Sequence, residues 1–210
     1  MFKGIIFDMD GVLFNSQSLH FSAERMTIEH FNGKITDTGL KNYLGWTESA
    51  FWAAIREKYA LNATVDELIQ YKRPIIYNLL VNSLHPDQEL QIVLSNLKKK
   101  GLRLGVASSS ERSLIILVLN SLGIKKFFEI VVSGEEVLRS KPAPDIFLKA
   151  AADLKVDPNS CIVVEDAPAG ILAANSAGMY SIALQNETNS GLDLSKAKKV
   201  ITNLNQLMKS

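Results

Sequence analysis

The stretch GIIFDMDGVLFNS, Gly4 to Ser16, joins an apolar run to two aspartates that lie one residue apart. The run from Gly4 to Phe7 has the composition of a buried strand, and Asp8 and Asp10 follow it directly. Neighbouring carboxylates repel one another, and burying one without a partner is costly. A positive group, either a basic side chain or a metal ion, is therefore expected beside them.

Apolar runs of strand length alternate with helical periodicity from about residue 88 to the end of the chain. The runs are LRLGVAS (102–108), EIVVS (129–133), CIVVED (161–166), YSIAL (180–184) and KVIT (199–202). Strands that are apolar throughout and separated by amphipathic helices predict a parallel sheet with both faces covered. Residues 16–83 contain no such run and have the pattern of helices. We therefore predict an α/β protein with a Rossmann-like parallel-sheet core (1–15 and 84–210) and an inserted all-α cap (16–83).

Composition excludes several classes of partner. The 23 basic and 22 acidic residues nearly cancel, which argues against binding to nucleic acid or to a membrane surface. A single cysteine, Cys161, allows no intramolecular disulfide and suits a reducing compartment. Asp8 and Asp10 would interrupt the apolar core of a signal peptide, and the longest apolar segment (114–124) is too short to span a bilayer. We expect a cytoplasmic protein.

Polar and charged residues gather at the predicted strand ends. Ligands of open α/β sheets bind at the carboxyl ends of the strands, so these residues are expected to meet at one edge. They are Asp8, Asp10, Ser108, Glu165 and Asp166, with Lys141 in the loop after another strand. Acids at strand ends also cap helices or pair with lysines, but four of them at two ends favour a hard cation with oxygen ligands, Mg²⁺. An EF-hand is excluded, because Gly11 comes too early and Leu19 replaces the bidentate glutamate.

Other phosphate chemistries can be tested by motif. The chain has no P-loop, no cysteine-phosphatase loop at Cys161 and no G-x-S-x-G elbow, which leaves a carboxylate as nucleophile. Asp8 is placed for that role at the tip of a strand, and Asp10 is left as general acid and base. Lys141 supplies fixed positive charge. Ser108 Oγ and the backbone N–H groups of Ser109 and Ser110 precede a helix and are expected to donate to phosphate oxygens.

Four motifs in order resemble the haloacid-dehalogenase superfamily, in its branch of β-phosphoglucomutases and sugar phosphatases with an α-helical cap. They are FDMDGVLFNS (7–16), VASSS (106–110), SKPAPDIF (140–147) and VVEDAPAGILAANSAGM (163–179). The resemblance implies Asp8 as nucleophile and Asp10 as acid/base. It also implies Mg²⁺ held by Asp8, the Asp10 backbone oxygen and Asp166, with Glu165 beside it, and a phosphate clamp of Ser108 and Lys141. A monomer that acts on a small phosphorylated metabolite is expected.

The cap departs from the mutases in ways that bear on the reaction. GWTES (45–49) resembles their substrate loop, which makes Gly45 and Trp46 candidate substrate residues, and His20 matches a histidine of both mutases and phosphatases. Glu48 stands where the mutases have a phosphate-binding arginine, and Glu111 where they have a lysine. Arg56, Lys72 or Arg73 are left as possible compensation. These differences favour a phosphatase, with a phosphohexomutase as the alternative.

Two further alternatives fit less well. A dehalogenase would have no use for Asp10 and the pair Glu165–Asp166. A signalling receiver domain is shorter and has its phospho-acceptor on a middle strand.

Overall fold

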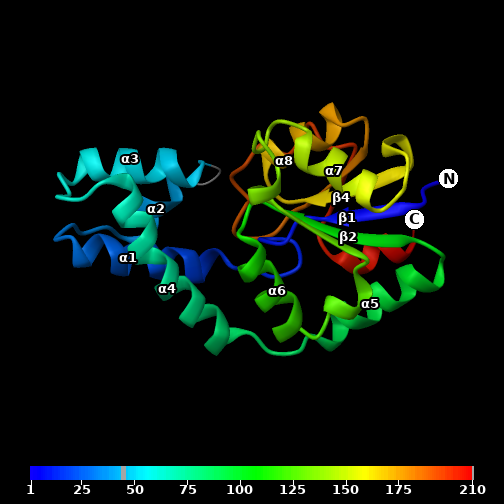
Figure 1. Ribbon diagram of the computed structural model, residues 1–210, viewed down its shortest axis with the longest axis horizontal. Helices are drawn as coiled ribbons and strands as arrows, with labels where there is room; N and C mark the ends of the chain where they lie inside the picture. The colour runs from blue at the N-terminus through cyan, green and yellow to red at the C-terminus, as the bar shows by residue number, and fades with distance from the viewer. Residues whose placement is uncertain (44–45, 210) are drawn as a thin grey trace. The chain divides into compact units, whose positions relative to one another are not determined.

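The computed structural model describes residues 1–43 and 46–209 (Figure 1). The chain divides into two compact units, one made of Met1–Asn15 and Leu84–Ser210 and the other of Ser16–Ser83. We call the first the core unit and the second the helical unit.

The core unit is built on a parallel sheet. Its strands are β1 (Gly4–Phe7), β2 (Arg103–Ser108), β3 (Ile130–Ser133), β4 (Cys161–Glu165), β5 (Tyr180–Leu184) and β6 (Lys199–Ile201). Their order in the described residues is β3-β2-β1-β4-β5-β6, with every pair parallel. The α/β Rossmann-like fold predicted from the sequence is confirmed.

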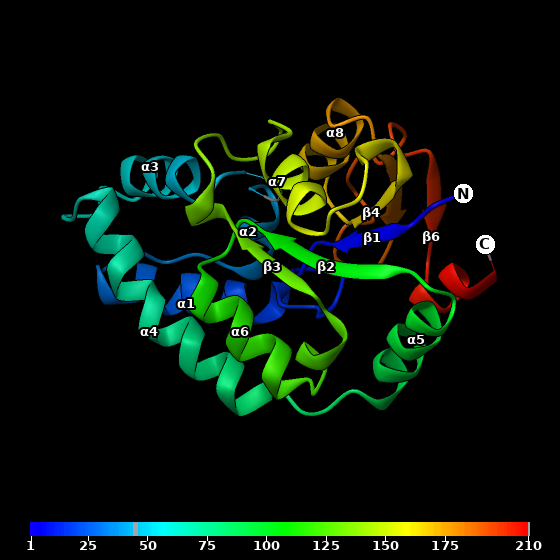
Figure 2. The ribbon, with the colours of Figure 1, turned by 45° about the vertical axis from the view of Figure 1, so that its right-hand side comes forward.

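Helices cover both faces of this sheet, which is why its central strands are apolar on both sides. Figures 1 and 2 show α7 (Asp145–Asp153) and α8 (Pro168–Ser176) on one face. On the other face lie α5 (Gln88–Lys99), α6 (Arg112–Ser121) and the 3₁₀ helix η4 (Leu204–Lys209). Shorter 3₁₀ turns are η1 (Lys125–Phe127), η2 (Gly134–Glu136) and η3 (Pro158–Ser160).

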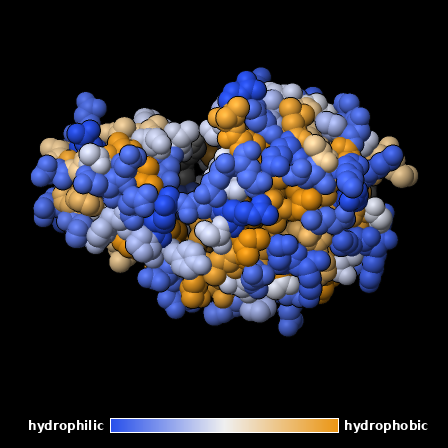
Figure 3. Space-filling model, viewed as in Figure 1, coloured by the Kyte–Doolittle hydropathy of each residue, from blue (hydrophilic) through white to orange (hydrophobic). Residues whose placement is uncertain are grey.

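Every residue of β1 and β4 is buried, so the strands that carry Asp8 and Glu165 are fixed by packing. Hydrophobic side chains from α7, α8 and the strands form one cluster that includes Ile6, Phe147 and Val163. On the face drawn in Figure 3, hydrophilic side chains lie between the hydrophobic ones of both units. Among the described residues, no helix has the length and apolar character of a membrane span.

The helical unit consists of α1 (Gln17–His30), α2 (Asp37–Lys41), α3 (Glu48–Lys58) and α4 (Val65–Ser83). Phe51 and Trp52 are buried in its own core with Phe21, Ile28 and Leu68. Thr36 and Thr47 cap α2 and α3 by accepting hydrogen bonds from Gly39 N and Ala50 N. The short helix α2 was not expected from the sequence, since five residues carry too little periodicity to be recognised.

Candidate active site

The strand order places the acidic residues at the point where the topology reverses. The chain runs outward from β1 through β2 to β3 and then returns to the other side of β1 as β4. Ligands of such sheets bind beyond the carboxyl ends of the strands at this reversal. Asp8 follows β1, Glu165 ends the adjacent β4, and Asp166 comes next. Sheet topology alone thus brings three carboxylates from distant parts of the sequence together.

Lys141 is the positive partner that the two aspartates led us to expect. Its Nζ donates to Asp8 Oδ1 at 2.5 Å and to Glu165 Oε1 at 2.8 Å, and all three side chains are at least nine-tenths buried. The ammonium group also lies 4.9 Å from the centre of the Phe147 ring. A lysine held on three sides in this way is a fixed positive charge beside Asp8.

Both carboxylate oxygens of Glu165 are already bonded within the core unit. Oε1 accepts from Lys141, and Oε2 accepts from the backbone N–H groups of Asp166 and Ala167 at 2.7 and 2.8 Å. The side chain packs on Gly170 in α8, where a Cβ would lie 1.8 Å from Oε1. Glu165 therefore fixes the loop that carries Asp166 and orients Lys141.

One carboxylate oxygen from each of Asp8, Glu165 and Asp166 lies within 4.8 Å of the others. Gly11 closes this cluster, because its φ is +74° and a Cβ there would stand 1.9 Å from Asp166 Oδ2. Only a residue without a side chain lets the turn after β1 approach Asp166 so closely.

The cluster holds more negative charge than its surroundings neutralise. Burial raises the pKa of Asp8 to about 7, with Glu165 and Asp10 adding to the effect and outweighing Lys141. Burial likewise raises the pKa of Asp166 to about 8, helped by the charges of Glu165, Asp8 and Asp10. Burial alone would lower the pKa of Lys141, but the carboxylates of Asp8 and Glu165 raise it above its ordinary value. A cation bound at this cluster would offset the charge of these carboxylates.

Ser108 ends β2 and is buried, while Ser109 beside it is exposed. The N–H of Ser110, which was expected to face a phosphate, donates instead to Ser108 Oγ at 3.1 Å. The Ser110 hydroxyl donates to Asp10 Oδ2 at 2.9 Å. The serine segment thus contacts one of the acids directly.

The candidate substrate residues of the cap belong to the helical unit. Trp46 is 53% exposed, His20 lies on α1, and Gly45 falls outside the described residues. Lys72 is buried in α4, where its Nζ donates to Glu48 Oε1 at 2.9 Å and lies 3.8 Å from Glu24 Oε1. Lys72 therefore neutralises Glu48 itself.

Sequence reasoning missed the residues that support the acids from a distance. Asn189, which is buried, donates to the carbonyl oxygens of Asp166 and Leu184, both at 2.9 Å. Asn186 donates to the Gly11 carbonyl at 3.2 Å. The sequence offers no signal for these roles, since asparagines in a loop after a strand are common.

Comparison with known proteins agrees with this geometry. The family model of haloacid dehalogenase-like hydrolases matches residues 5–184. β-Phosphoglucomutase of Bacillus subtilis (strain 168) is 34% identical in an alignment 208 positions long, gaps included; the aligned residues cover 91% of this chain and 88% of that protein. Fructose-1-phosphate phosphatase of Escherichia coli (strain K12) is 30% identical over 184 residues, 86% of this chain and 95% of that protein.

A solved structure is similar over nearly the whole chain. The crystal structure of β-phosphoglucomutase from Clostridium difficile superposes with a TM-score of 0.80 at 30% identity and covers 99% of this chain and 93% of that one. The family model spans the strands that carry the acids, and the similar proteins span both units. The chain therefore belongs to the haloacid dehalogenase-like hydrolases.

Proposed function

We propose that this protein is a Mg²⁺-dependent phosphatase that hydrolyses a small phosphomonoester, a sugar phosphate, through an aspartyl-phosphate. The observation that carries the proposal is Asp8 at the topological reversal, with Lys141 Nζ 2.5 Å from Oδ1 and the Asp166 carboxylate in the same cluster. Both named relatives above support phosphoryl chemistry on sugars.

The reaction has two steps. An Asp8 oxygen attacks phosphorus, the bond from phosphorus to the ester oxygen breaks, and Asp10 gives its proton to the departing alkoxide. Water then attacks the same phosphorus, Asp10 takes the proton, and the Asp8 carboxylate leaves as inorganic phosphate departs. Lys141, Ser108 and Ser109 hold the phosphate oxygens during both steps.

The donors in the core unit fit Mg²⁺. The carboxylates of Asp8, Glu165 and Asp166 lie together with one lysine, Lys141, beside them. Burial, together with the neighbouring carboxylates, raises the pKa values of Asp8 and Asp166. Oxygen ligands of this kind suit Mg²⁺, which would neutralise charge between Asp8 and an incoming phosphate. We propose that Asp8, Asp166 and the Asp10 backbone oxygen hold the ion. Glu165 lies beside the ion, where it orients Lys141 and the loop that carries Asp166.

Mg²⁺ is expected to stabilise the protein more at about pH 8 than at about pH 5.5. Because the pKa values of Asp8 and Asp166 are about 7 and 8 when folded and near 3.8 ordinarily, the metal-free folded state keeps protons that the unfolded chain has lost. Its stability therefore falls as pH rises through this window. Mg²⁺ binds the ionised carboxylates, so its effect grows over the same range. Thermal unfolding with Mg²⁺ and with EDTA measures the difference.

Matched ionic strength with NaCl is the control for that experiment. An equal Mg²⁺ effect at both pH values, or no effect at either, would contradict a metal site made of these acids.

Phosphatase is favoured over mutase by the pairing of Lys72 with Glu48 inside the helical unit. A mutase must hold a second phosphate on its bis-phosphorylated intermediate. Glu48 stands where the mutases have a phosphate-binding arginine. Lys72, a candidate to replace that arginine, is paired with Glu48 instead. We propose that Trp46, Gly45 and His20 contact a sugar with one phosphate.

Release of inorganic phosphate across a panel of sugar phosphates, with Mg²⁺, tests the proposed function. Rapid release from one or a few members is the expected result and names the substrate class. The panel includes fructose 1-phosphate and β-glucose 1-phosphate. Conversion of the latter to glucose 6-phosphate without phosphate release would instead identify a phosphohexomutase.

We further propose that the protein is a cytoplasmic monomer without nucleic-acid or membrane partners. Sedimentation of the purified protein tests its oligomeric state.

A further inference from the structure

One hydrogen bond joins the proposed acid/base to a side-chain hydroxyl that has no role so far. Ser110 Oγ donates to Asp10 Oδ2 at 2.9 Å, although the two residues lie 100 positions apart in the chain. We propose that Ser110 is a positioning residue, whose hydroxyl holds the Asp10 carboxylate in the orientation from which it exchanges protons. This inference rests on the proposed function, because it assigns Ser110 a task only if Asp10 acts as acid and base.

Ser110 is itself held by the core of the sheet. Its N–H donates to Ser108 Oγ at 3.1 Å, and its carbonyl accepts from Ser133 Oγ at 2.7 Å. Ser108 and Ser133 are the last residues of β2 and β3, pair with each other in register, and are both buried. The backbone of Ser110 is thus tied to two strand ends, so its side chain starts from a fixed point.

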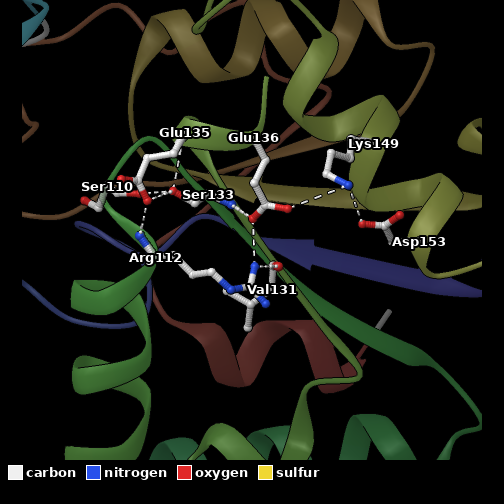
Figure 4. Close-up of polar contacts among 8 residues, drawn as sticks. All are labelled: Ser110, Arg112, Val131, Ser133, Glu135, Glu136, Lys149 and Asp153. Carbon is white, nitrogen blue, oxygen red and sulfur yellow. Dashed lines mark hydrogen bonds and ion pairs between the residues drawn. The ribbon is translucent and has the colours of Figure 1, made fainter. Parts of the chain in front are cut away.

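The turn after β3 supports the serine segment from behind. Gly134 packs so closely on it that a Cβ would lie 2.7 Å from the Ser109 carbonyl oxygen. Glu135 Oε2 accepts from the backbone N–H of Arg112 at 2.9 Å, which fixes the start of α6 just after Ser110. Figure 4 shows the Glu135 carboxylate next to Ser110 and Ser133, with a dashed line to Arg112.

Glu136 and Arg112 close the network. Glu136 Oε1 accepts from Ser133 N at 2.9 Å and from Arg112 Nη1 at 2.7 Å, and the same guanidinium nitrogen donates to the Val131 carbonyl at 2.9 Å (Figure 4). Ser133 and Glu136 form a reciprocal capping box around η2. Arg112 and Glu136 thus each bond to the backbone of β3, at Val131 and Ser133, and their own ion pair is exposed.

A carboxylate needs such support because rotation about its terminal bond is soft. A hydrogen bond to one oxygen limits that rotation and keeps the proton-transferring atoms in line with the reacting oxygen. General acid–base catalysis contributes about 10²–10⁴-fold, and this contribution depends on geometry. Loss of the Ser110 hydroxyl should cost part of it and leave binding of the phosphate group nearly unchanged.

The test is the dependence of kcat/KM on the leaving group in wild type, Ser110→Ala and Ser110→Thr. This constant reports transfer of the phosphoryl group to Asp8, the step in which Asp10 acts as acid. The sugar phosphate has a poor leaving group that needs the proton, whereas p-nitrophenolate leaves without it. We expect Ser110→Ala to lose roughly 10- to 100-fold on the sugar phosphate and less than about 3-fold on p-nitrophenyl phosphate. Ser110→Thr should recover most of the loss.

Ser133→Ala and Ser190→Ala make the comparison specific. Ser133→Ala removes the bond to the Ser110 carbonyl. Its kcat/KM should also fall more on the sugar phosphate than on p-nitrophenyl phosphate, but by less than in Ser110→Ala. It also carries the test if Ser110→Ala fails to fold. Ser190→Ala removes an exposed hydroxyl-to-backbone bond elsewhere in the core unit and should change neither ester.

Equal losses on both esters, or no loss on either, would overturn the positioning role of Ser110. A lowered melting temperature with equal kcat/KM losses on the two esters would mean that Ser110 has only a structural role, and this would overturn the proposal as well. Failure of the proposed function is a separate result, since wild-type protein would then release no phosphate from any ester.

Discussion

Asp8→Asn is expected to abolish turnover, with kcat falling by at least about 10⁴-fold. The amide keeps the shape of the side chain beside Lys141, but its oxygen is a far poorer nucleophile and cannot form a stable acyl-phosphate. Because the loss is chemical, substrate binding should be retained. Release of phosphate from the best member of the panel, with Mg²⁺, measures the effect.

Asp145→Asn is the matched control, since Asp145 lies in the same unit but forms an exposed ion pair with Arg139. It should keep nearly full activity. Asp8→Asn should also melt at a higher temperature than wild type in EDTA at about pH 8, because the raised pKa of Asp8 means that its ionised form is unfavourable there. Residual activity of Asp8→Asn above a few per cent of wild type would show that Asp8 is not the nucleophile.

The gathering of the acids was predictable because it depends on topology. Once strands are parallel, their carboxyl ends meet, and the sequence places Asp8, Ser108 and Glu165 at three such ends. No knowledge of side-chain directions is needed for that step. The bounds of the strands and longer helices were likewise within reach, since buried runs and glycine stops mark them.

The partners of each acid were not predictable, because they depend on register and on side-chain direction. Glu165 was expected beside a metal, yet its oxygens are engaged by Lys141 and by two backbone N–H groups. The sequence VVED alone does not distinguish a glutamate that binds a metal from one that bonds to a lysine and to backbone N–H groups. The close approach of Gly11 to Asp166 is likewise visible only in three dimensions.

The helical unit shows the same limit from another side. Lys72 could be named as a basic residue of a predicted helix, but its burial and its bond to Glu48 follow from how α3 and α4 pack. A charge count along the sequence leaves such a lysine available to a substrate. The structure shows that its charge is paired with Glu48 and, at a longer distance, with Glu24.

Lys141→Ala is expected to damage stability and catalysis together. Removing the ammonium group leaves Asp8 and Glu165 as buried carboxylates without their common partner, which typically costs about 3–5 kcal/mol of unfolding free energy. It also removes the fixed charge proposed to stabilise the transferred phosphoryl group, a change worth about 10²–10³-fold in kcat. Urea unfolding and phosphate release measure the two effects on the same preparation.

Lys149→Ala is the comparison that isolates burial in this prediction. Lys149 also has two carboxylate partners, Asp153 and Glu136, but its side chain is 33% exposed, against 9% for Lys141. Solvent screens such pairs, so its loss should cost less than about 1 kcal/mol and leave kcat unchanged. Mg²⁺ should restore part of the stability of Lys141→Ala, because a divalent cation neutralises the same carboxylates, and should do nothing for Lys149→Ala. Similar losses in the two variants would mean that Lys141 is an ordinary structural lysine, and the proposed phosphate clamp would lose its central charge.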